Sequence, residues 1–455
     1  MAKYFGTNGV RGKFNELTPE LSLKLSQAIG TYLKKGKMIV ARDCRLTGET
    51  IKSAVVAGLA SVGCDVIDIG IVSSPTAEYM IKKLKTNGCI IVSASHNPPE
   101  WNALKVIDGK GIAISKERGE EIEKLIKKPA LVEWNRVGKI TIYENAVEDH
   151  IQEILSVIGT RKASIKKPKI VIDCGNGTAA TIAPLLFRKM GVEFLSLNSH
   201  MDGTFPGRPS EPTEVNVKQL IAMVKSSKSD AGIAWDGDGD RVIFVDKEGR
   251  YIIGDKVYAL SIIWKFTKKD QQGDVVTTVA TSKIIEDVAK KYESKVRYTA
   301  IGAPYLCEEM VKIKPAKDGT AKPNAIIGGE EVGGVIWPEI SLAKDGMFTA
   351  AMMAESICDK PLDEWLEEVP EYFNFKIKVE ADSEKKIKIV EKILSHAKDN
   401  KLDFVDIDGV RINFNDSWVI VRASGTENYV RIFAEAKTKE DAQKLVDEYK
   451  EMCRV

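Results

Sequence analysis

The stretch that decides the fold is AGIAWDGDGDR, at residues 231–241. Its first five residues form an apolar run typical of a buried β-strand, and three aspartates at alternate positions follow at once. Ligands in α/β sheets bind outside the carboxyl ends of the strands. The same order recurs at residues 89–98, where the apolar run CIIV precedes SASHNP. Together the two stretches predict an α/β protein with a functional site at the edge of its sheets.

Three segments of the chain repeat one alternation of strand and helix. The expected strands are 38–41, 66–69 and 89–93, then 169–172, 193–195 and 231–235, then 275–279, 295–298 and 325–327. Helical periodicity lies between them at 50–62, 75–84, 179–190, 215–224, 283–291 and 305–311. Short strands that alternate with helices are typical of βαβ units. We therefore expect three related α/β domains whose loops face one cleft.

The chain changes character from about residue 370. Strands are expected at 373–379, 418–421 and 430–433, and helices at 385–397 and 440–452. This order favours a smaller α+β domain. The expected domain limits are 1–148, 149–252, 253–368 and 369–455.

The three aspartates, Asp236, Asp238 and Asp240, favour a metal site. Clustered carboxylates repel one another, and a hard divalent cation removes that repulsion by taking oxygen ligands. An EF-hand would need Gly and Glu where this loop has Arg241 and Lys247. The alternative is a surface turn, since Asp and Gly both favour turns.

A phosphate on Ser95 would supply one further oxygen to such a cation. The serine therefore suggests a metal-assisted phosphoserine enzyme when it is taken together with the aspartates. Taken alone, a serine in the turn SHNPP is more often a cap. The nucleophile pattern Gly-x-Ser-x-Gly is absent around Ser95.

Three further motifs carry polar or charged side chains near turns. The loop RASGT at 422–426 offers a guanidinium, two hydroxyls and a flexible backbone, which suits a phosphate as well as it suits an exposed turn. Glu330, beside paired glycines, could accept hydrogen bonds from sugar hydroxyls, although a glycine-rich strand end is the simpler interpretation. For the arginines at 5–12 and 42–45, solvated charge is the ordinary explanation.

Composition narrows the choice of partners and compartment. Lys and Arg number 67 against 65 Asp and Glu, so no charge excess indicates a nucleic acid or a membrane as partner. The seven cysteines are scattered and never form a Cys-x-x-Cys pair, which favours reduced thiols in a cytoplasm. The N-terminus lacks the apolar core of a signal peptide.

The set of motifs resembles that of the α-D-phosphohexomutases, in their archaeal and bacterial phosphoglucomutase/phosphomannomutase branch, over essentially the whole chain. The resemblance implies three related α/β domains and a fourth α+β domain around a central cleft. It implies that Ser95 is phosphorylated and that it completes a Mg²⁺ site made by Asp236, Asp238 and Asp240. The other residues carried over are the catalytic Arg11, Lys105 and Arg241, the sugar-binding Glu330, and the phosphate-binding Arg422, Ser424, Gly425, Thr426 and Arg431.

Lys105 is the candidate for proton transfer, and burial among cations would lower its pKa. The implied reaction interconverts hexose 1-phosphate and hexose 6-phosphate through a hexose 1,6-bisphosphate, which is also the activator. Glucose and mannose phosphates are the first choice, and phosphoglucosamine is the alternative. Two other readings are a metal-dependent sugar phosphatase and a catalytically silent sugar-phosphate-binding protein. The chain is expected to be a monomer or a homodimer.

Overall fold

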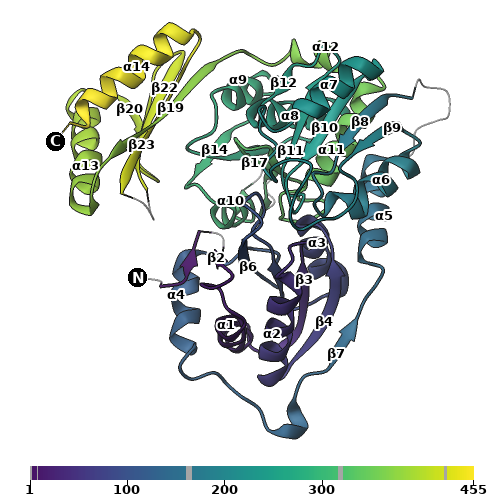
Figure 1. The fold of residues 1–455 in the computed structure, drawn as a ribbon. Coiled ribbons are helices and arrows are strands. Elements are labelled where there is room, and N and C mark those ends of the chain that lie inside the picture. The colour runs from purple at the N-terminus through teal and green to yellow at the C-terminus, as the bar shows by residue number, and fades with distance from the viewer. Residues whose placement is uncertain (1–2, 8, 160–166, 316–320, 425–427, 455) are drawn as a thin grey trace. The chain divides into compact units, whose positions relative to one another are not determined.

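The computed structural model describes residues 3–7, 9–159, 167–315, 321–424 and 428–454 (Figure 1). The chain divides into two compact units. Unit 1 contains Met1–Val257, Gly302–Glu308 and Val332–Leu366, and unit 2 contains Tyr258–Ile301, Glu309–Glu331 and Glu367–Val455. Unit 1 thus holds the first two expected α/β modules. Unit 2 holds three strands of the third module and the C-terminal domain.

The three modules share one strand order. Their strands are β3 (Gly36–Arg42), β4 (Cys64–Ile71) and β5 (Gly88–Val92), then β8 (Lys169–Asp173), β9 (Glu193–Leu197) and β10 (Ala231–Trp235), then β13 (Asp274–Thr278), β14 (Val296–Thr299) and β17 (Ala325–Glu330). In each module the first strand pairs in parallel with the second on one side and with the third on the other. The expectation of three related α/β modules is confirmed.

Helices connect these parallel strands. The first module has α2 (Gly48–Ser61) and α3 (Ser74–Leu84), and the second has α6 (Ala179–Met190) and α7 (Lys218–Ser227). Right-handed crossovers are the rule for parallel strands. The two crossovers of a module run in opposite directions, so its two helices cover opposite faces of the sheet. The helix α1 (Pro19–Tyr32) packs beside α2 (Figure 1).

An antiparallel strand follows the third strand in both modules of unit 1. The strand β6 (Trp101–Asp108) returns beside β5, and β11 (Val242–Asp246) returns beside β10. The first sheet has the order β1-β2-β6-β5-β3-β4-β7, with β1 at Phe5–Gly6, β2 at Gly9–Lys13 and β7 at Ile140–Ile142. The serine loop and the aspartate loop are therefore equivalent turns, each joining the carboxyl end of a parallel strand to an antiparallel neighbour.

The inner strands of these sheets are buried on both faces. Every residue of β5, β10 and β11 is buried. Strands covered by helices on both faces are expected to be continuously apolar. The loops that leave β5 and β10 are thus attached to strands that are fully buried in unit 1.

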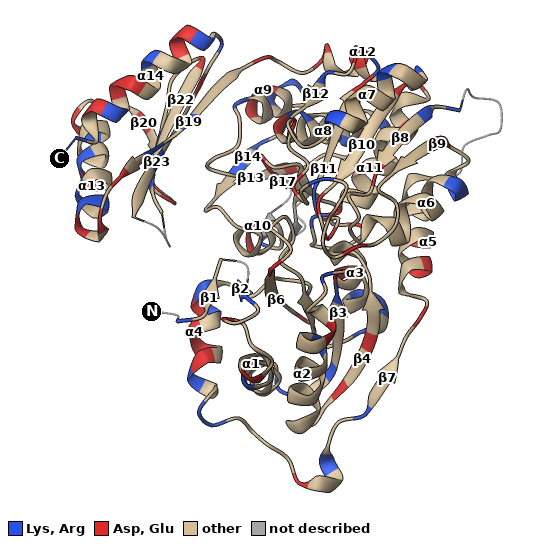
Figure 2. Cartoon of the chain, viewed as in Figure 1, with Lys and Arg blue, Asp and Glu red and all other residues tan. Residues whose placement is uncertain are grey.

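The C-terminal domain is an antiparallel sheet with two helices. Its order is β19-β23-β22-β21-β20, at Phe373–Glu380, Tyr429–Ala436, Ser417–Ala423, Val410–Asn413 and Asp403–Val405. The helices α13 (Ser383–Asp399) and α14 (Lys439–Met452) pack on the sheet and on each other, so they cover the same face. Charges of both signs are interspersed along these two helices (Figure 2). The expected α+β domain is confirmed.

The remaining elements complete the chain. They are α4 (Lys116–Leu125), η1 (Trp134–Arg136), α5 (Ala146–Ile158), β12 (Tyr251–Ile252), α8 (Gly254–Lys268), α9 (Ile284–Lys291), α10 (Ala303–Met310), β15 (Ile313–Pro315), β16 (Ala321–Pro323), β18 (Gly334–Ile336), α11 (Gly346–Ile357) and α12 (Leu362–Leu366). Across the described ranges, no helix is both long enough and apolar enough to cross a bilayer.

Candidate active site

Ser95 lies on the turn that follows β5, and its hydroxyl points at the aspartate loop. The Ser95 backbone is left-handed, with φ 52°. A non-glycine residue held in this region costs on the order of 1–3 kcal/mol, and such strain persists where surrounding contacts fix it. The Ser95 N–H donates to Ser93 Oγ at 3.0 Å, and Ser95 Oγ donates to Asp236 Oδ2 at 2.6 Å.

The aspartate loop brings three carboxylates together. One oxygen from each of Asp236, Asp238 and Asp240 lies within 4.8 Å of the others, and all three residues are buried. The intervening glycines have physical reasons. A Cβ on Gly237 would stand 2.7 Å from the Ser95 carbonyl oxygen, and Gly239 has φ +75°. These glycines let the loop pass against the serine turn while successive acids face one point.

The triad contains two unsatisfied oxygens. Asp238 Oδ1 and Asp240 Oδ1 are buried and accept no hydrogen bond from any residue that the structure describes. Leaving a buried acceptor unsatisfied costs about 1–3 kcal/mol, and more for a charged group. A hard divalent cation takes carboxylate oxygens as ligands. The donor set therefore fits Mg²⁺.

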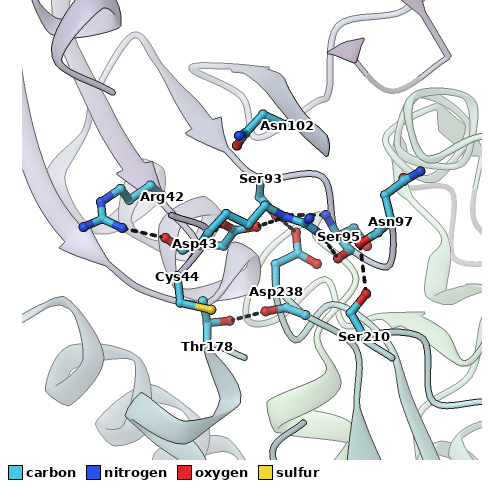
Figure 3. Close-up of polar contacts among 12 residues, drawn as sticks. Arg42, Asp43, Cys44, Ser93, Ser95, Asn97, Asn102, Thr178, Ser210 and Asp238 are labelled. Carbon is cyan, nitrogen blue, oxygen red and sulfur yellow. Dashed lines mark hydrogen bonds and ion pairs between the residues drawn. The ribbon is translucent and has the colours of Figure 1, made fainter. Parts of the chain in front are cut away.

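The other triad oxygens accept hydrogen bonds from the first module. Asp238 Oδ2 accepts from Ser74 Oγ at 2.5 Å, from Ser93 Oγ at 3.0 Å and from Lys105 Nζ at 2.5 Å. Ser93, Ser95 and Asp238 lie together at this point (Figure 3). Residues from both modules thus fix the orientation of Asp238.

The surroundings of the triad shift the pKa values of Asp236 and Asp240 in opposite directions. Burial and the negative charges of Asp240 and Asp238 raise the pKa of Asp236. Burial also disfavours the ionised form of Asp240, but Lys105 and Lys344 outweigh it and lower the pKa of that carboxyl. Adjacent cations thus favour the ionised form of Asp240, whereas the negative charges of its neighbours favour the protonated form of Asp236, as expected where several acids share one site.

Lys105, on β6, is buried between two of these acids. Its Nζ lies 2.5 Å from Asp238 Oδ2 and 3.2 Å from Asp240 Oδ2. Burial lowers the pKa of Lys105, but the negative charges of Asp238 and Asp240 outweigh it, so the net shift is upward. The expectation of a lowered pKa is wrong, because the closest groups are anions and not cations.

Arg11 and Arg241 complete the cationic lining around Ser95. Arg11 Nη1 donates to Asn97 Oδ1 on the serine turn. The Arg241 N–H donates to Asp236 Oδ1 at 3.2 Å, and its side chain is 16% exposed. Burial, followed by Arg241 and Arg11, lowers the pKa of His96 to about 3, so this imidazole is neutral. The structure brings all predicted residues of unit 1 together.

The predicted phosphate-binding residues lie in unit 2. Arg422 on β22 and Arg431 on β23 are register partners, and Ser424 is buried just beyond β22. Arg422 Nε donates to Asp408 Oδ1 at 2.6 Å, and Arg431 Nη2 donates to the Tyr429 hydroxyl at 2.8 Å. Gly425 and Thr426 lie outside the described residues.

Glu330 is also in unit 2 and forms the last residue of β17, with 8% of its surface exposed. Residues 328–330 therefore belong to the strand itself and not to a loop after it. The motif keeps its place at the carboxyl end of the third strand of a module, equivalent to the ends of β5 and β10.

Sequence reasoning missed several buried charges in unit 1. Lys344 is buried, with Nζ 3.6 Å from Asp240 Oδ2, and it immediately precedes Asp345, the N-cap of α11. Asp43 and Arg45 are fully buried as an ion pair, so solvated charge is the wrong explanation for these two residues. The position of Asp43 and Arg45 could have indicated their burial, because residues 43–45 directly follow the carboxyl end of a module's first strand.

Family models describe four consecutive parts of the chain. The phosphoglucomutase/phosphomannomutase models match α/β/α domain I at residues 2–133, domain II at 148–249, domain III at 253–373 and the C-terminal domain at 376–452. The chain therefore belongs to the phosphoglucomutase/phosphomannomutase family of the α-D-phosphohexomutases. It is an isomerase of the phosphomutase type.

Relatives agree on this reaction class and differ in the sugar. The phosphoglucomutase/phosphomannomutase of Thermococcus kodakarensis is 38% identical over 98% of this chain and 97% of its own length. The phosphoglucosamine/phosphogalactosamine mutase of Sulfurisphaera tokodaii is 36% identical over 99% of each. The solved structure of a family protein from Burkholderia thailandensis has a TM-score of 0.85 at 23% identity, over 98% of this chain and 96% of its own.

Proposed function

We propose that the protein interconverts hexose 1-phosphate and hexose 6-phosphate by way of a phosphoserine at Ser95 and a hexose 1,6-bisphosphate. The observation that carries this proposal is the 2.6 Å contact between Ser95 Oγ and Asp236 of the buried triad. A nucleophilic oxygen directly beside a cation site is the arrangement that metal-assisted phosphoryl transfer requires.

The residues of unit 1 divide the chemistry among them. Asp236, Asp238 and Asp240 would hold one Mg²⁺ together with a phosphoserine oxygen, and a bound Mg²⁺ neutralises charge on the transferring group. Arg11 and Arg241 provide further positive charge beside Ser95. Transfer breaks the bond from phosphorus to Ser95 Oγ and forms one from phosphorus to a sugar hydroxyl oxygen. The hydroxyl proton is lost, and Ser95 regains a proton.

Lys105 supports the proton balance of this step. Its raised pKa keeps the ammonium charged, so in this step it can donate a proton toward the departing Ser95 oxygen but cannot accept one, and the same shift makes it a weak acid. The reverse transfer, from the bisphosphate back to Ser95, needs the same proton returned. This assignment makes Lys105 the acid of the forward half-reaction.

Arg422, Ser424 and Arg431, with Gly425 and Thr426, would hold the phosphate that does not react. The loop must accept this phosphate whether the phosphate is on C1 or on C6. It therefore recognises the charge of the phosphate and not the carbon atom that bears it. Two arginines on neighbouring strands give such a site without sugar contacts. Glu330 would read the hydroxyls at C3 and C4 by accepting hydrogen bonds.

Glucose and mannose phosphates are the substrates we favour, because the chain resembles a phosphoglucomutase/phosphomannomutase at 38% identity. Phosphoglucosamine is the second candidate. It is favoured by the similarity to a mutase named for glucosamine and galactosamine phosphates at 36% identity.

The test is intact-mass analysis of the purified protein before and after incubation with glucose 1,6-bisphosphate and Mg²⁺. The wild type should gain one phosphate, whereas Ser95→Ala should gain none and should lose mutase activity. Ser53→Ala is the matched control, because Ser53 is an exposed helical serine. Ser95→Ala with wild-type turnover would overturn the nucleophile. Steady release of inorganic phosphate would favour a phosphatase, and absence of both transfer and turnover would favour a binding protein.

A further inference from the structure

Arg45 is a fully buried arginine that holds the turn carrying Ser95. Its Nε donates to Asp43 Oδ2 at 3.0 Å, and both side chains have no exposed surface. Its Nη2 donates to the carbonyl oxygens of Ser95 at 2.8 Å and Asn97 at 2.7 Å, and its Nη1 donates to that of Pro98. One guanidinium therefore gathers three carbonyls of a single turn.

These hydrogen bonds from Arg45, together called the Arg45 clamp, fix the backbone of Ser95, which carries the nucleophile. The Ser95 carbonyl belongs to the residue whose backbone is left-handed, with φ 52°. A strained conformation persists only where surrounding contacts over-determine it. Arg45 supplies such contacts on the carboxyl side of the residue, and the Ser93 hydroxyl supplies one at its N–H. The direction of the Ser95 side chain follows from this backbone.

The second module contains an equivalent buried arginine, Arg208, whose contacts are called the Arg208 clamp. Arg208 Nε donates to Asp173 Oδ2 at 2.7 Å, and its Nη2 donates to the carbonyl oxygen of Trp235 at 2.7 Å. Trp235 is the residue directly before Asp236. In both modules a buried arginine is paired with an acid at or just after the end of the first strand. Arg45 donates to carbonyls of the turn after the third strand, and Arg208 donates to the carbonyl of the last residue of the third strand. One clamp holds Ser95 and the other holds Asp236.

The two clamps are joined by the segment 205–210. The ring of Phe205 lies 5.1 Å from the guanidinium carbon of Arg45. At the other end of the segment, Ser210 Oγ donates to the Asn97 carbonyl oxygen at 3.1 Å, the same oxygen that Arg45 reaches (Figure 3). Displacing either arginine therefore disturbs the turn held by the other.

We propose that Arg45 and Arg208 are positioning residues that jointly set the alignment of Ser95 with Asp236. The inference rests on the proposed function, because it concerns the phosphoryl transfer assigned to Ser95. Neither guanidinium is required to touch the substrate. A misplacement of about 1 Å in a reacting group can cost roughly a hundredfold in rate. The clamps thus affect the transfer step, while substrate binding depends on other residues.

The experiment compares Arg45→Lys and Arg208→Lys in the full-length protein. Lysine keeps the charge beside the acid but cannot donate to several carbonyls in a fixed fork. The rate constant for phosphorylation of Ser95 is measured at saturating glucose 1,6-bisphosphate by quenched-flow and mass analysis. Each variant should lose about ten- to a hundredfold in that rate. Half-saturation by the bisphosphate should stay within about threefold. The double variant should lose less than the product of the single losses, because the clamps share one segment.

The control is Arg411→Lys. Arg411 is equally buried and donates to the carbonyls of Val279 and Thr281, at 2.9 Å each, but it belongs to unit 2. It should lower the melting temperature comparably while the phosphorylation rate stays within about threefold. Equal rate losses in Arg411→Lys and Arg45→Lys would overturn the inference, because they would reflect general destabilisation.

A second variant and a chemical rescue distinguish a loss of positioning from misfolding. Asp43→Asn leaves Arg45 in place but removes the charge of its partner, and it should slow phosphorylation by a smaller factor. Free guanidinium at low millimolar concentration should restore part of the rate to Arg45→Ala. If the variants fold and phosphorylate Ser95 at the wild-type rate, the inference about Arg45 and Arg208 is wrong, but the proposed function is unaffected. A wild type that never phosphorylates Ser95 would instead contradict the proposed function.

Discussion

Arg422 and Arg431 lie directly opposite each other on adjacent antiparallel strands. Like charges in this position destabilise a sheet. Arg422 Nε donates to Asp408 Oδ1 at 2.6 Å, and the Arg431 guanidinium lies over the Tyr429 ring. A dianionic phosphate between the two guanidinium groups would remove the repulsion. We therefore expect this pair to bind an anion, which is the role proposed for it above.

Arg422→Ala should weaken both hexose 1-phosphate and hexose 6-phosphate to similar degrees. Loss of a charge-assisted hydrogen bond costs on the order of 2 kcal/mol, roughly a 30-fold rise in KM. The measurement is KM in both directions of the reaction. Arg250→Ala, an exposed arginine paired with Asp246, should change neither value. A loss confined to one isomer would show that the site does not serve both orientations.

Removal of Mg²⁺ should abolish turnover, and its return should restore it. The cation should also raise the melting temperature, because it would satisfy Asp238 Oδ1 and Asp240 Oδ1 in the folded state. At a hundred times its Kd, such binding stabilises by about 2.7 kcal/mol. Thermal unfolding with and without Mg²⁺ tests this, and Asp238→Asn should lose most of the shift. Asp202→Asn, which changes a partly exposed aspartate outside the triad, should keep the whole shift, and full activity in excess chelator would refute the metal assignment.

Glu78→Gln should stabilise the protein at pH 9 but not at pH 5. Burial raises the pKa of Glu78 to about 8, against the lowering effect of Lys105. A raised carboxyl pKa contributes stability that is complete below the ordinary value near 4.5 and is lost as the pH rises to 8. Removing the charge should therefore gain on the order of 1–3 kcal/mol at pH 9, discounted because the side chain is partly exposed.

Denaturant unfolding in chelator at both pH values measures this difference. Glu121→Gln, an exposed helical glutamate, is the control and should behave as the wild type at both. An equal effect of Glu78→Gln at pH 5 and pH 9 would mean that this carboxyl titrates normally.

Much of the fold could be predicted from apolar patterns. The helix expected at 179–190 has those bounds in the structure, because apolar periodicity continues up to Gly191, which adopts φ 71° as the C-cap. The strand β6 was missed, although it carries Lys105. Its sequence, WNALKVID, is buried almost throughout and places Asn and Lys inward, so it neither alternates nor forms a continuous apolar run.

The juxtaposition of Ser95 and the triad could be predicted from local motifs. Ser95 and the triad stand in recognisable loops, and the strand ends placed them correctly at one edge of unit 1. Arg45 and Lys344 could not be recognised in this way, because a single arginine or lysine in a turn is usually solvated. Their partners, the carbonyls after β5 and the carboxylate of Asp240, are distant in sequence. A charged side chain that is buried by residues distant in sequence leaves no pattern in the residues around it.

The protein should discriminate poorly between glucose 1-phosphate and mannose 1-phosphate, which differ at C2. Glu330 would read the C3 and C4 hydroxyls that both sugars share, and Val332 offers no hydrogen bond where a serine or asparagine could. Strong rejection requires a buried polar group left unpaired by the wrong substrate. We therefore expect kcat/KM values within about a hundredfold of each other. Saturation curves at matched bisphosphate and Mg²⁺, with glucosamine 1-phosphate as the third sugar, provide the measurement. A preference beyond about a thousandfold for either epimer would reveal a C2-reading group, and the same preference for glucosamine 1-phosphate would make the second candidate the substrate.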